Sequence, residues 1–271
     1  MTGTGTVTFD APAKLTLSLR VTGRRTDGYH LLDAEMVALD LVDSLTFGPG
    51  DDLSVVDEVV GGTGTAEVPT GPDNLVARAL DLVGRRASVR MVKRIPAGAG
   101  LGGGSADAAA VLRWAGVGDP ALAVQLGADV PFCLAGGRAR VTGVGEVVEA
   151  LSFEARRFVL LLPPISVSTA AVYRAFDESG VPVGSRRLPE AGNDLEEAAL
   201  AVSPRLGAWR DRLAEACGRR PRLAGSGSTW FVEGGPVELG LEGRAFLDLE
   251  GERAALWAVG TLPPGAGASE T

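Results

Sequence analysis

The feature that most constrains this chain is a segment, residues 96–115, that passes directly from a run of glycines into an alanine-rich stretch. Glycines at 98, 100, 102, 103 and 104 leave a backbone that an anion can approach without meeting a Cβ atom. The alanines that follow predict a helix with small side chains that packs closely on its neighbours, and Ser105 is expected to cap its start. Because the N–H groups at a helix start can bind phosphate, the segment predicts a phosphate-binding loop.

Two familiar phosphate-binding motifs are alternatives to this interpretation. The Walker A motif needs a lysine after its last glycine, and here Gly104 is followed by Ser105. The segment 98–103 does satisfy GxGxxG, but it follows Ile95 and Pro96 in mid-chain rather than opening a clear βαβ unit. A flexible glycine loop without a ligand is the remaining alternative for this segment taken alone.

Composition excludes several classes of protein. A net charge of −8 argues against a nucleic-acid partner, because that affinity comes mainly from basic side chains. The strongest apolar run, residues 158–165, contains two prolines and is far shorter than the roughly 20 residues of a membrane span. The first residues lack the pattern of a signal peptide, so a cytoplasmic location is expected. The two cysteines, Cys133 and Cys217, lie far apart and predict buried thiols rather than a structural metal site.

The hydrophobic pattern predicts an alternation of strands and helices. Residues 6–9 and 15–21 are expected to be strands on either side of a break at 11–14, which places Lys14 at a strand edge. Residues 51–72 are polar and are expected to form a hairpin or loop, before a helix that Asn74 caps and that runs through Val83. A strand is expected over 88–95. A new strand after Arg156 suggests a domain boundary near residue 150, which divides the chain into 1–150 and 151–271.

A few residues outside the glycine loop could carry chemistry. Asp129 precedes Val130 and Pro131, a pattern that is also typical of an ordinary helix cap. Only two of the 26 basic residues are lysines, Lys14 and Lys93, which can mark places that need a compact point charge, although Lys14 taken alone is more often a solvated lysine at a strand end. A tight turn at residues 27–28 would present Tyr29 and His30 together, to stack on a base or simply to pack.

Four ordered segments together resemble the superfamily of galactokinase, homoserine kinase, mevalonate kinase and phosphomevalonate kinase. They are residues 11–15 (APAKL), 95–106 (IPAGAGLGGGSA), 126–131 (LGADVP) and 224–229 (AGSGST). Within that superfamily, residues 21–31 (VTGRRTDGYHL) and 127–131 are similar to the family of kinases that phosphorylate the 2-hydroxyl of 4-diphosphocytidyl-2-C-methyl-D-erythritol in non-mevalonate isoprenoid biosynthesis.

The resemblance implies an α+β fold with two domains, a ribosomal-S5-like N-terminal domain that binds ATP and a ferredoxin-like C-terminal domain that completes the substrate cleft. It implies ATP and Mg²⁺ as cofactors, a small-molecule substrate, and a monomer or weak dimer. Lys14 and Asp129 would be the catalytic pair, with Asp129 as the base and Lys14 orienting the hydroxyl. The metal ligands are not identified, although Ser105 is a candidate neighbour of Mg²⁺ as well as a helix cap.

The resemblance also assigns binding residues. The nucleotide would contact Pro96, Ala97, Gly98, Ala99, Gly100, Leu101, Gly102, Gly103, Gly104, Ser105 and Ala106. The substrate would contact Thr16, Tyr29, His30, Lys93, Thr169 and Tyr173, with Lys93 approaching its diphosphate. Thr16 replaces an asparagine common in the family, and Tyr173 replaces a common phenylalanine. A homoserine or mevalonate type of kinase, a related decarboxylase and a non-catalytic nucleotide-binding relative remain the alternatives.

Overall fold

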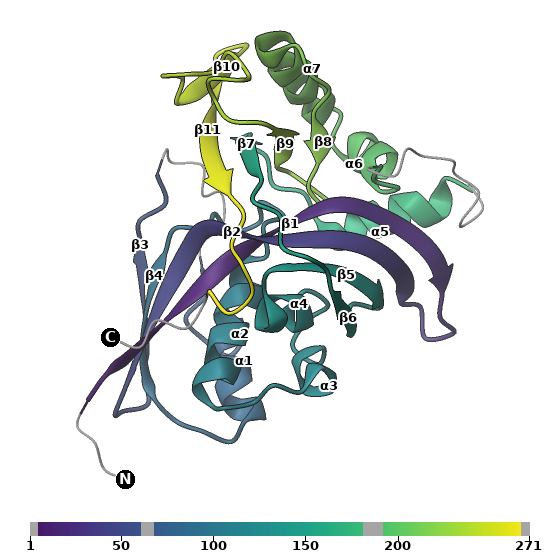
Figure 1. The fold of residues 1–271 in the computed structure, drawn as a ribbon. Coiled ribbons are helices and arrows are strands. Elements are labelled where there is room, and N and C mark those ends of the chain that lie inside the picture. Colours follow the sequence, from purple (N-terminus) through teal and green to yellow (C-terminus); the bar gives the residue numbers. More distant parts are fainter. Residues whose placement is uncertain (1–4, 61–67, 181–191, 267–271) are drawn as a thin grey trace.

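The structure is a computed structural model that describes residues 5–60, 68–180 and 192–266. In these residues the strands form two sheets (Figure 1). The first sheet has the order β3-β4-β2-β5-β6, with β1 paired to β2; the second has the order β10-β11-β7-β9-β8. The first contains β1 (Val7–Arg24), β2 (His30–Gly48), β3 (Leu53–Asp57), β4 (Ser88–Lys93), β5 (Arg138–Gly143) and β6 (Val147–Ala150). The second contains β7 (Arg157–Leu162), β8 (Arg222–Leu223), β9 (Trp230–Glu233), β10 (Phe246–Leu249) and β11 (Glu252–Gly260).

The long antiparallel ribbon of β1 and β2 corrects the expectation of two strands around a break. β1 is one strand, and the sequence signal at residues 11–14 marks a shift in its pairing with β2 between Pro12 and Lys14. A proline has no N–H to give to the sheet, so an irregularity there is the usual solution. The backbone N–H of Lys14 donates to the carbonyl of Leu101 at 2.9 Å, so the irregularity joins the strand to the glycine loop.

The region after β2 is also more regular than expected. Residues 53–57, which were expected to lie in a loop or hairpin, form β3 and pair in parallel with β4. Leu53 and Val55 pack against the first core and so give this short strand one apolar face.

Helices cover one face of the first sheet. They are α1 (Leu75–Leu82), α2 (Gly103–Trp114), α3 (Pro120–Ala123) and α4 (Val130–Ala135). The Asn74 side chain accepts from the N–H of Val76 at 2.7 Å, which confirms the expected cap of α1. The alanines at 106, 108, 109 and 110 of α2 are all buried, and their small side chains allow close packing on the sheet and on α1 and α4.

The second sheet packs against α5 (Thr169–Glu178), α6 (Glu196–Val202) and α7 (Arg205–Cys217); in Figure 1, α6 and α7 lie beside β8 and α5 lies next to the β1–β2 ribbon. Trp209 of α7 and Trp230 of β9 are the largest side chains of this core. No helix in the described residues is long and apolar enough to cross a membrane.

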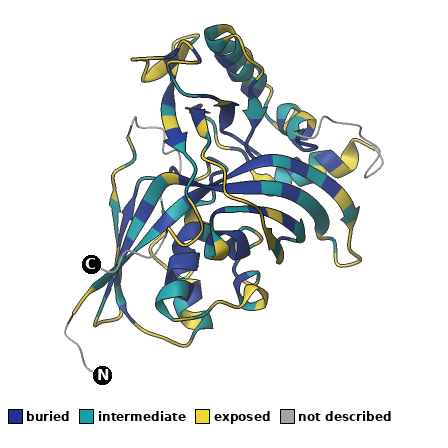
Figure 2. Ribbon diagram, in the orientation of Figure 1, coloured by how far each residue is buried: buried dark blue, intermediate teal, exposed yellow. Residues whose placement is uncertain are grey.

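The β1–β2 ribbon is part of the first sheet and also packs against the second. Leu15 and Leu39 of the ribbon share a buried cluster with Leu160 of β7, while Leu19 and Val21 belong to the core of the second sheet. Figure 2 shows the ribbon dark with buried residues where it crosses the molecule. The chain changes sheet between Ala150 and Arg157, and the division into domains 1–150 and 151–271 stays a prediction because the ribbon serves both cores.

Candidate active site

Lys14 and Asp129 face each other where the ribbon meets the glycine loop. Lys14 Nζ lies 3.3 Å from Asp129 Oδ2 and 3.2 Å from Thr16 Oγ1. The lysine side chain is only 6 % exposed, whereas the carboxylate is 32 % exposed. The arrangement therefore holds a buried cation beside a carboxylate that a ligand can reach.

The start of α4 explains why the Asp129 carboxylate is available. Asp129 occupies the cap position before Val130 and Pro131, as the sequence predicts, but its side chain makes no capping hydrogen bond. A proline early in the helix removes one N–H that a cap would otherwise satisfy. The carboxylate is therefore free to pair with Lys14 instead.

The glycine loop is built from left-handed residues. Gly98, Gly100 and Gly102 have φ angles of +75°, +78° and +69°, a region that favours glycine. Gly102 occupies the cap position of α2, and Gly103 and Gly104 already belong to the helix. The expectation that Ser105 caps α2 is therefore wrong: the left-handed turn at Gly102 starts the helix three residues earlier than a serine cap would.

A second glycine run, residues 224–229, packs against this loop. A Cβ atom on Gly100 would lie 2.5 Å from the carbonyl oxygen of Gly227, and one on Gly102 would lie 2.7 Å from Lys14 Cγ. The Thr229 hydroxyl donates to the carbonyl of Ala99 at 2.7 Å. These contacts bring all four segments that carry the family resemblance to one place.

Asn193 holds the second glycine run and was missed from the sequence. Its Nδ2 donates to the carbonyls of Leu223 at 3.0 Å and Gly225 at 2.7 Å, and its Oδ1 accepts from the N–H of Leu195. A Cβ atom on Gly225 would lie 3.5 Å from Lys14 Nζ. Asn193 therefore fixes the backbone beside the lysine head group.

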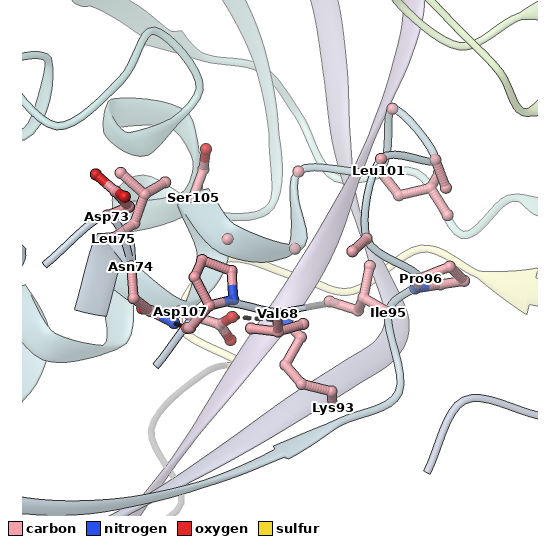
Figure 3. Close-up of a pocket in the computed structure, with 18 residues that line it drawn as sticks. Val68, Asp73, Asn74, Leu75, Lys93, Ile95, Pro96, Leu101, Ser105 and Asp107 are labelled. Atoms are coloured by element: carbon pink, nitrogen blue, oxygen red, sulfur yellow. Dashed lines mark hydrogen bonds and ion pairs between the residues drawn. The ribbon is translucent and has the colours of Figure 1, made fainter. Parts of the chain in front are cut away.

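A pocket of about 340 Å³ opens beside the glycine loop (Figure 3). The loop residues 96–105 line it, together with Val68, Pro69 and the start of α1 with its preceding residues, Asp73, Asn74 and Leu75. Figure 3 shows the Ser105 hydroxyl pointing away from Lys93 and Asp107, which also line the pocket. A Cβ atom on Gly127 would lie 4.0 Å from that hydroxyl, so Ser105 faces the segment that leads to Asp129.

Lys93 belongs to a buried cluster of three charges with Asp43 and Asp107. Its Nζ contacts both carboxylates, with 2.5 Å to Asp107 Oδ2, and all three side chains are at most 4 % exposed. Burial alone would lower the pKa of Lys93, but the two carboxylates outweigh it and raise that pKa. Burial raises the pKa of Asp107 to about 7, although Lys93 opposes the shift. Sequence reasoning singled out the lysine but missed both aspartates.

The predicted turn is present at residues 25–29. Gly28 has a φ of +94°, and the N–H of Arg25 donates to the carbonyl of Tyr29 at 2.7 Å. Tyr29 is 65 % exposed at the tip. His30 instead stacks on Tyr173 of α5 with 4.7 Å between ring centroids, so the turn separates the two side chains that were expected to act together.

The other predicted substrate residues occupy two places. Thr169 Oγ1 lies 2.9 Å from Ser226 Oγ of the second glycine run. Burial, with the negative charge of Asp129 as a smaller cause, raises the pKa of the Tyr173 hydroxyl. The structure thus brings His30, Thr169 and Tyr173 to α5, whereas Lys93 lies at the separate pocket beside the glycine loop.

The described residues hold no group of three His, Cys, Asp or Glu side chains that could bind a metal ion. Of the two thiols, Cys133 is buried, and burial raises its pKa to about 12. A thiol with that pKa is inert at neutral pH.

Comparisons with known proteins agree on one family. Residues 74–137 match the model for the N-terminal domain of GHMP kinases. The 4-diphosphocytidyl-2-C-methyl-D-erythritol kinase of Paracoccus denitrificans is 42 % identical over 82 % of this chain and 84 % of its own length. The enzyme of that name from Cereibacter sphaeroides strain KD131 is 38 % identical over 94 % of this chain and 95 % of its own length.

Solved structures give the same result. A crystal structure of a 4-(cytidine 5'-diphospho)-2C-methyl-D-erythritol kinase is 34 % identical, covers 97 % of this chain and 100 % of its own, and has a TM-score of 0.70. The mevalonate kinase of Methanococcus jannaschii is only 12 % identical over 94 % of this chain and 98 % of its own, with a TM-score of 0.58, and shares the fold alone.

Proposed function

The chain belongs to the 4-diphosphocytidyl-2-C-methyl-D-erythritol kinase family of the GHMP kinases, and from this premise we propose that it transfers the γ-phosphoryl group of ATP to the 2-hydroxyl of that substrate. The observation that carries the proposal is the 3.3 Å pair of Lys14 and Asp129 at the edge of the glycine loop. The reaction is a step of non-mevalonate isoprenoid biosynthesis. Its products are ADP and the phosphorylated alcohol.

Asp129 is the group that takes the hydroxyl proton. As the proton passes to its carboxylate, the substrate oxygen forms a bond to the γ-phosphorus and the bond from that phosphorus to the β,γ-bridging oxygen breaks. Lys14 Nζ lies 3.3 Å from Asp129 Oδ2, close enough to hold the substrate hydroxyl in line with the carboxylate. Thr16, which stands where asparagine is common, accepts a hydrogen bond from Lys14 Nζ at 3.2 Å.

The glycine loop and the start of α2 are the proposed site for the ATP phosphates. The first N–H groups of α2, which begins at Gly103, have no partner within the helix, and the positive end of the helix dipole adds about 0.3–1 kcal/mol for an exposed unit charge. The nucleoside part of ATP would enter the adjoining pocket of about 340 Å³. Residues 96–106 would therefore contact the nucleotide as a continuous segment.

Magnesium fits this chain as an ion carried mainly by the nucleotide. Mg²⁺ usually keeps several waters and takes one or two protein ligands beside substrate phosphates. Ser105 offers a hydroxyl oxygen next to the 127–129 segment, so Ser105 is the proposed neighbour of the ion. When bound, the ion would neutralise charge on the phosphates.

The cytidyl part of the substrate is proposed to bind near Tyr29, His30, Thr169 and Tyr173. The aromatic rings supply stacking surfaces, and Tyr29 is exposed at the tip of the turn. A direct contact from Lys93 to the diphosphate stays a prediction. Two buried carboxylates already neutralise Lys93, so the diphosphate would have to displace at least one of them.

The test is release of ADP from the purified protein with Mg-ATP and one of three alcohols: the cytidyl substrate, homoserine or mevalonate. We expect turnover with the cytidyl substrate alone. Turnover with homoserine or mevalonate instead would keep the kinase chemistry and overturn the proposed substrate. An absence of ADP with all three would overturn the kinase proposal in favour of a non-catalytic nucleotide-binding protein.

A further inference from the structure

Asp177, on α5, contacts both ends of the turn that carries Tyr29 and His30. Its Oδ1 lies 2.7 Å from His30 Nε2, and its Oδ2 lies 3.3 Å from a guanidinium nitrogen of Arg24. Arg24 and His30 are directly paired residues of β1 and β2. One carboxylate on a helix therefore holds the two strands where the turn between them begins and ends.

Two aromatic residues of α5 hold the His30 side chain, whereas Tyr29 is exposed at the tip of the turn. Tyr173, Phe176 and Asp177 are spaced as neighbours on one face of α5. The imidazole stacks on Tyr173 and meets Phe176 edge-on at 6.1 Å, which leaves the His30 side chain 10 % exposed. A carboxylate oxygen can accept a hydrogen bond from Nε2 when that nitrogen carries hydrogen, which fits the 2.7 Å contact.

The same helix reaches the reaction centre at its other end. Thr169, the first residue of α5, contacts Ser226 in the glycine run that passes Lys14. The helix therefore connects the turn with the loop beside the catalytic pair. A shift of the turn on α5 would change where a substrate held by the turn presents its hydroxyl.

We propose that Asp177 is a positioning residue, which fixes the turn of residues 25–29 against α5 and thereby sets the affinity for the cytidyl substrate. The proposal rests on the proposed function. Without the carboxylate, Arg24 loses its partner on α5, and only the ring contacts of His30 with Tyr173 and Phe176 still hold the turn to the helix, so the turn becomes more mobile. Ordering it again on binding would cost affinity for the substrate and not for ATP.

The experiment compares Asp177→Ala with Asp177→Asn and with Glu178→Gln. Glu178 is an exposed acid next to Asp177 on the same helix, so its substitution removes the same charge without touching the turn. We expect Asp177→Ala to raise the KM for the cytidyl substrate about tenfold, the size of one hydrogen bond to a charged group, and to leave kcat and the KM for ATP within about twofold. Asp177→Asn can still accept from Nε2 and should restore part of the affinity, while Glu178→Gln should match the wild type.

A second readout does not depend on catalysis. Arg24 and Arg25 are trypsin sites at the exposed turn, and contacts with α5 should slow their cleavage by opposing local unfolding of the turn. We expect trypsin to cleave Asp177→Ala there about tenfold faster than Glu178→Gln, with unchanged thermal midpoints in both. An unchanged cleavage rate, an unchanged KM for the substrate, or equal increases in both Michaelis constants would overturn the proposal. If the wild type turns over no cytidyl substrate, the proposed function fails, and the cleavage rates alone decide whether Asp177 fixes the turn.

Discussion

The two lysines, Lys14 and Lys93, differ in how exposed their carboxylate partners are. Lys14 pairs with one carboxylate that is about a third exposed, whereas Lys93 pairs with two that are almost fully buried. A partly exposed carboxylate can accept a proton from a bound substrate, whereas a fully buried one is out of a substrate's reach. The proposed catalytic role therefore falls to Lys14, whereas the contacts of Lys93 are those of a lysine that stabilises the fold.

The first prediction concerns the unit formed by Lys14 and Asp129. Asp129→Asn and Lys14→Ala should each lower kcat by about a hundred- to ten-thousandfold, because each removes a part that the other needs. The double variant should be no slower than the slower single variant, since groups that act as a unit are not additive. Initial rates of ADP release under saturating ATP and substrate measure this. Additive losses in the double variant would mean that the two residues act independently.

The second prediction concerns the pH dependence of stability at Asp107. Its native pKa of about 7 lies above the ordinary value of 3.8, so between these values the unfolded chain releases a proton that the native protein keeps. The contribution of this group to the free energy of unfolding therefore falls as pH rises from about 4 to about 7, by at most about 1.4 kcal/mol per pH unit, and is constant above pH 7. Asp107→Asn cannot ionise and lacks this loss.

Denaturant unfolding of the wild type and of Asp107→Asn at several pH values isolates the effect. The difference between their unfolding free energies should shift in favour of the variant between pH 4 and pH 7 and then level off. A difference that is flat over this range would show that Lys93 holds Asp107 ionised throughout.

At the scale of elements, the close approach of the two glycine runs leads to the third prediction. Gly100→Ala places a Cβ atom 2.5 Å from a backbone carbonyl, whereas Gly116→Ala has a similar φ of +74° and no atom within 4 Å of the added Cβ. Both substitutions carry the strain of a left-handed alanine, about 1–2 kcal/mol. Only Gly100→Ala also separates the loops, so it should cost at least about 2 kcal/mol more and lower kcat steeply. Thermal unfolding and ADP release measure both effects, and equal costs would contradict the packing argument.

Short sequence motifs predicted those helices that are determined by residues next to each other in the chain. Asn74 caps α1 because a short polar side chain bonds two residues ahead, and the glycine run followed by alanines gave α2. Ser105 was misplaced as a cap because glycines can also enter a helix. The partners of Lys93 and His30, Asp43 and Asp177, lie 50 and 147 residues away from them, and only the pairing of strands and helices brings such pairs together. Asn193 was missed for the same reason.

At the scale of the whole molecule, the end of the described chain joins the two sheets. Thr261, after β11, forms a bridge with Leu39 of β2. Its hydroxyl accepts from the N–H of Arg156 at 2.9 Å and donates to the carbonyl of Glu154 at 2.8 Å, both in the segment between β6 and β7. The N–H of Leu262 donates to the carbonyl of Ala38. The segment after β11 therefore ties the second sheet to β2 and to the segment between β6 and β7, in addition to the packing of the β1–β2 ribbon on the second sheet.

The fourth prediction is that the two sheets unfold in one transition. Trp114 packs in the first core, stacked on Phe47 with ring centroids 4.8 Å apart, while the other three tryptophans belong to the second sheet or α7. In Trp114→Phe, which keeps a ring on Phe47, fluorescence reports only the second sheet and its helices, whereas circular dichroism reports the whole chain. Because neither core closes without the ribbon, the two signals should share one denaturant midpoint. Separate midpoints would mean that the halves are independent domains, with the boundary near residue 150 that the sequence suggests and a cleft between them that opens at little cost.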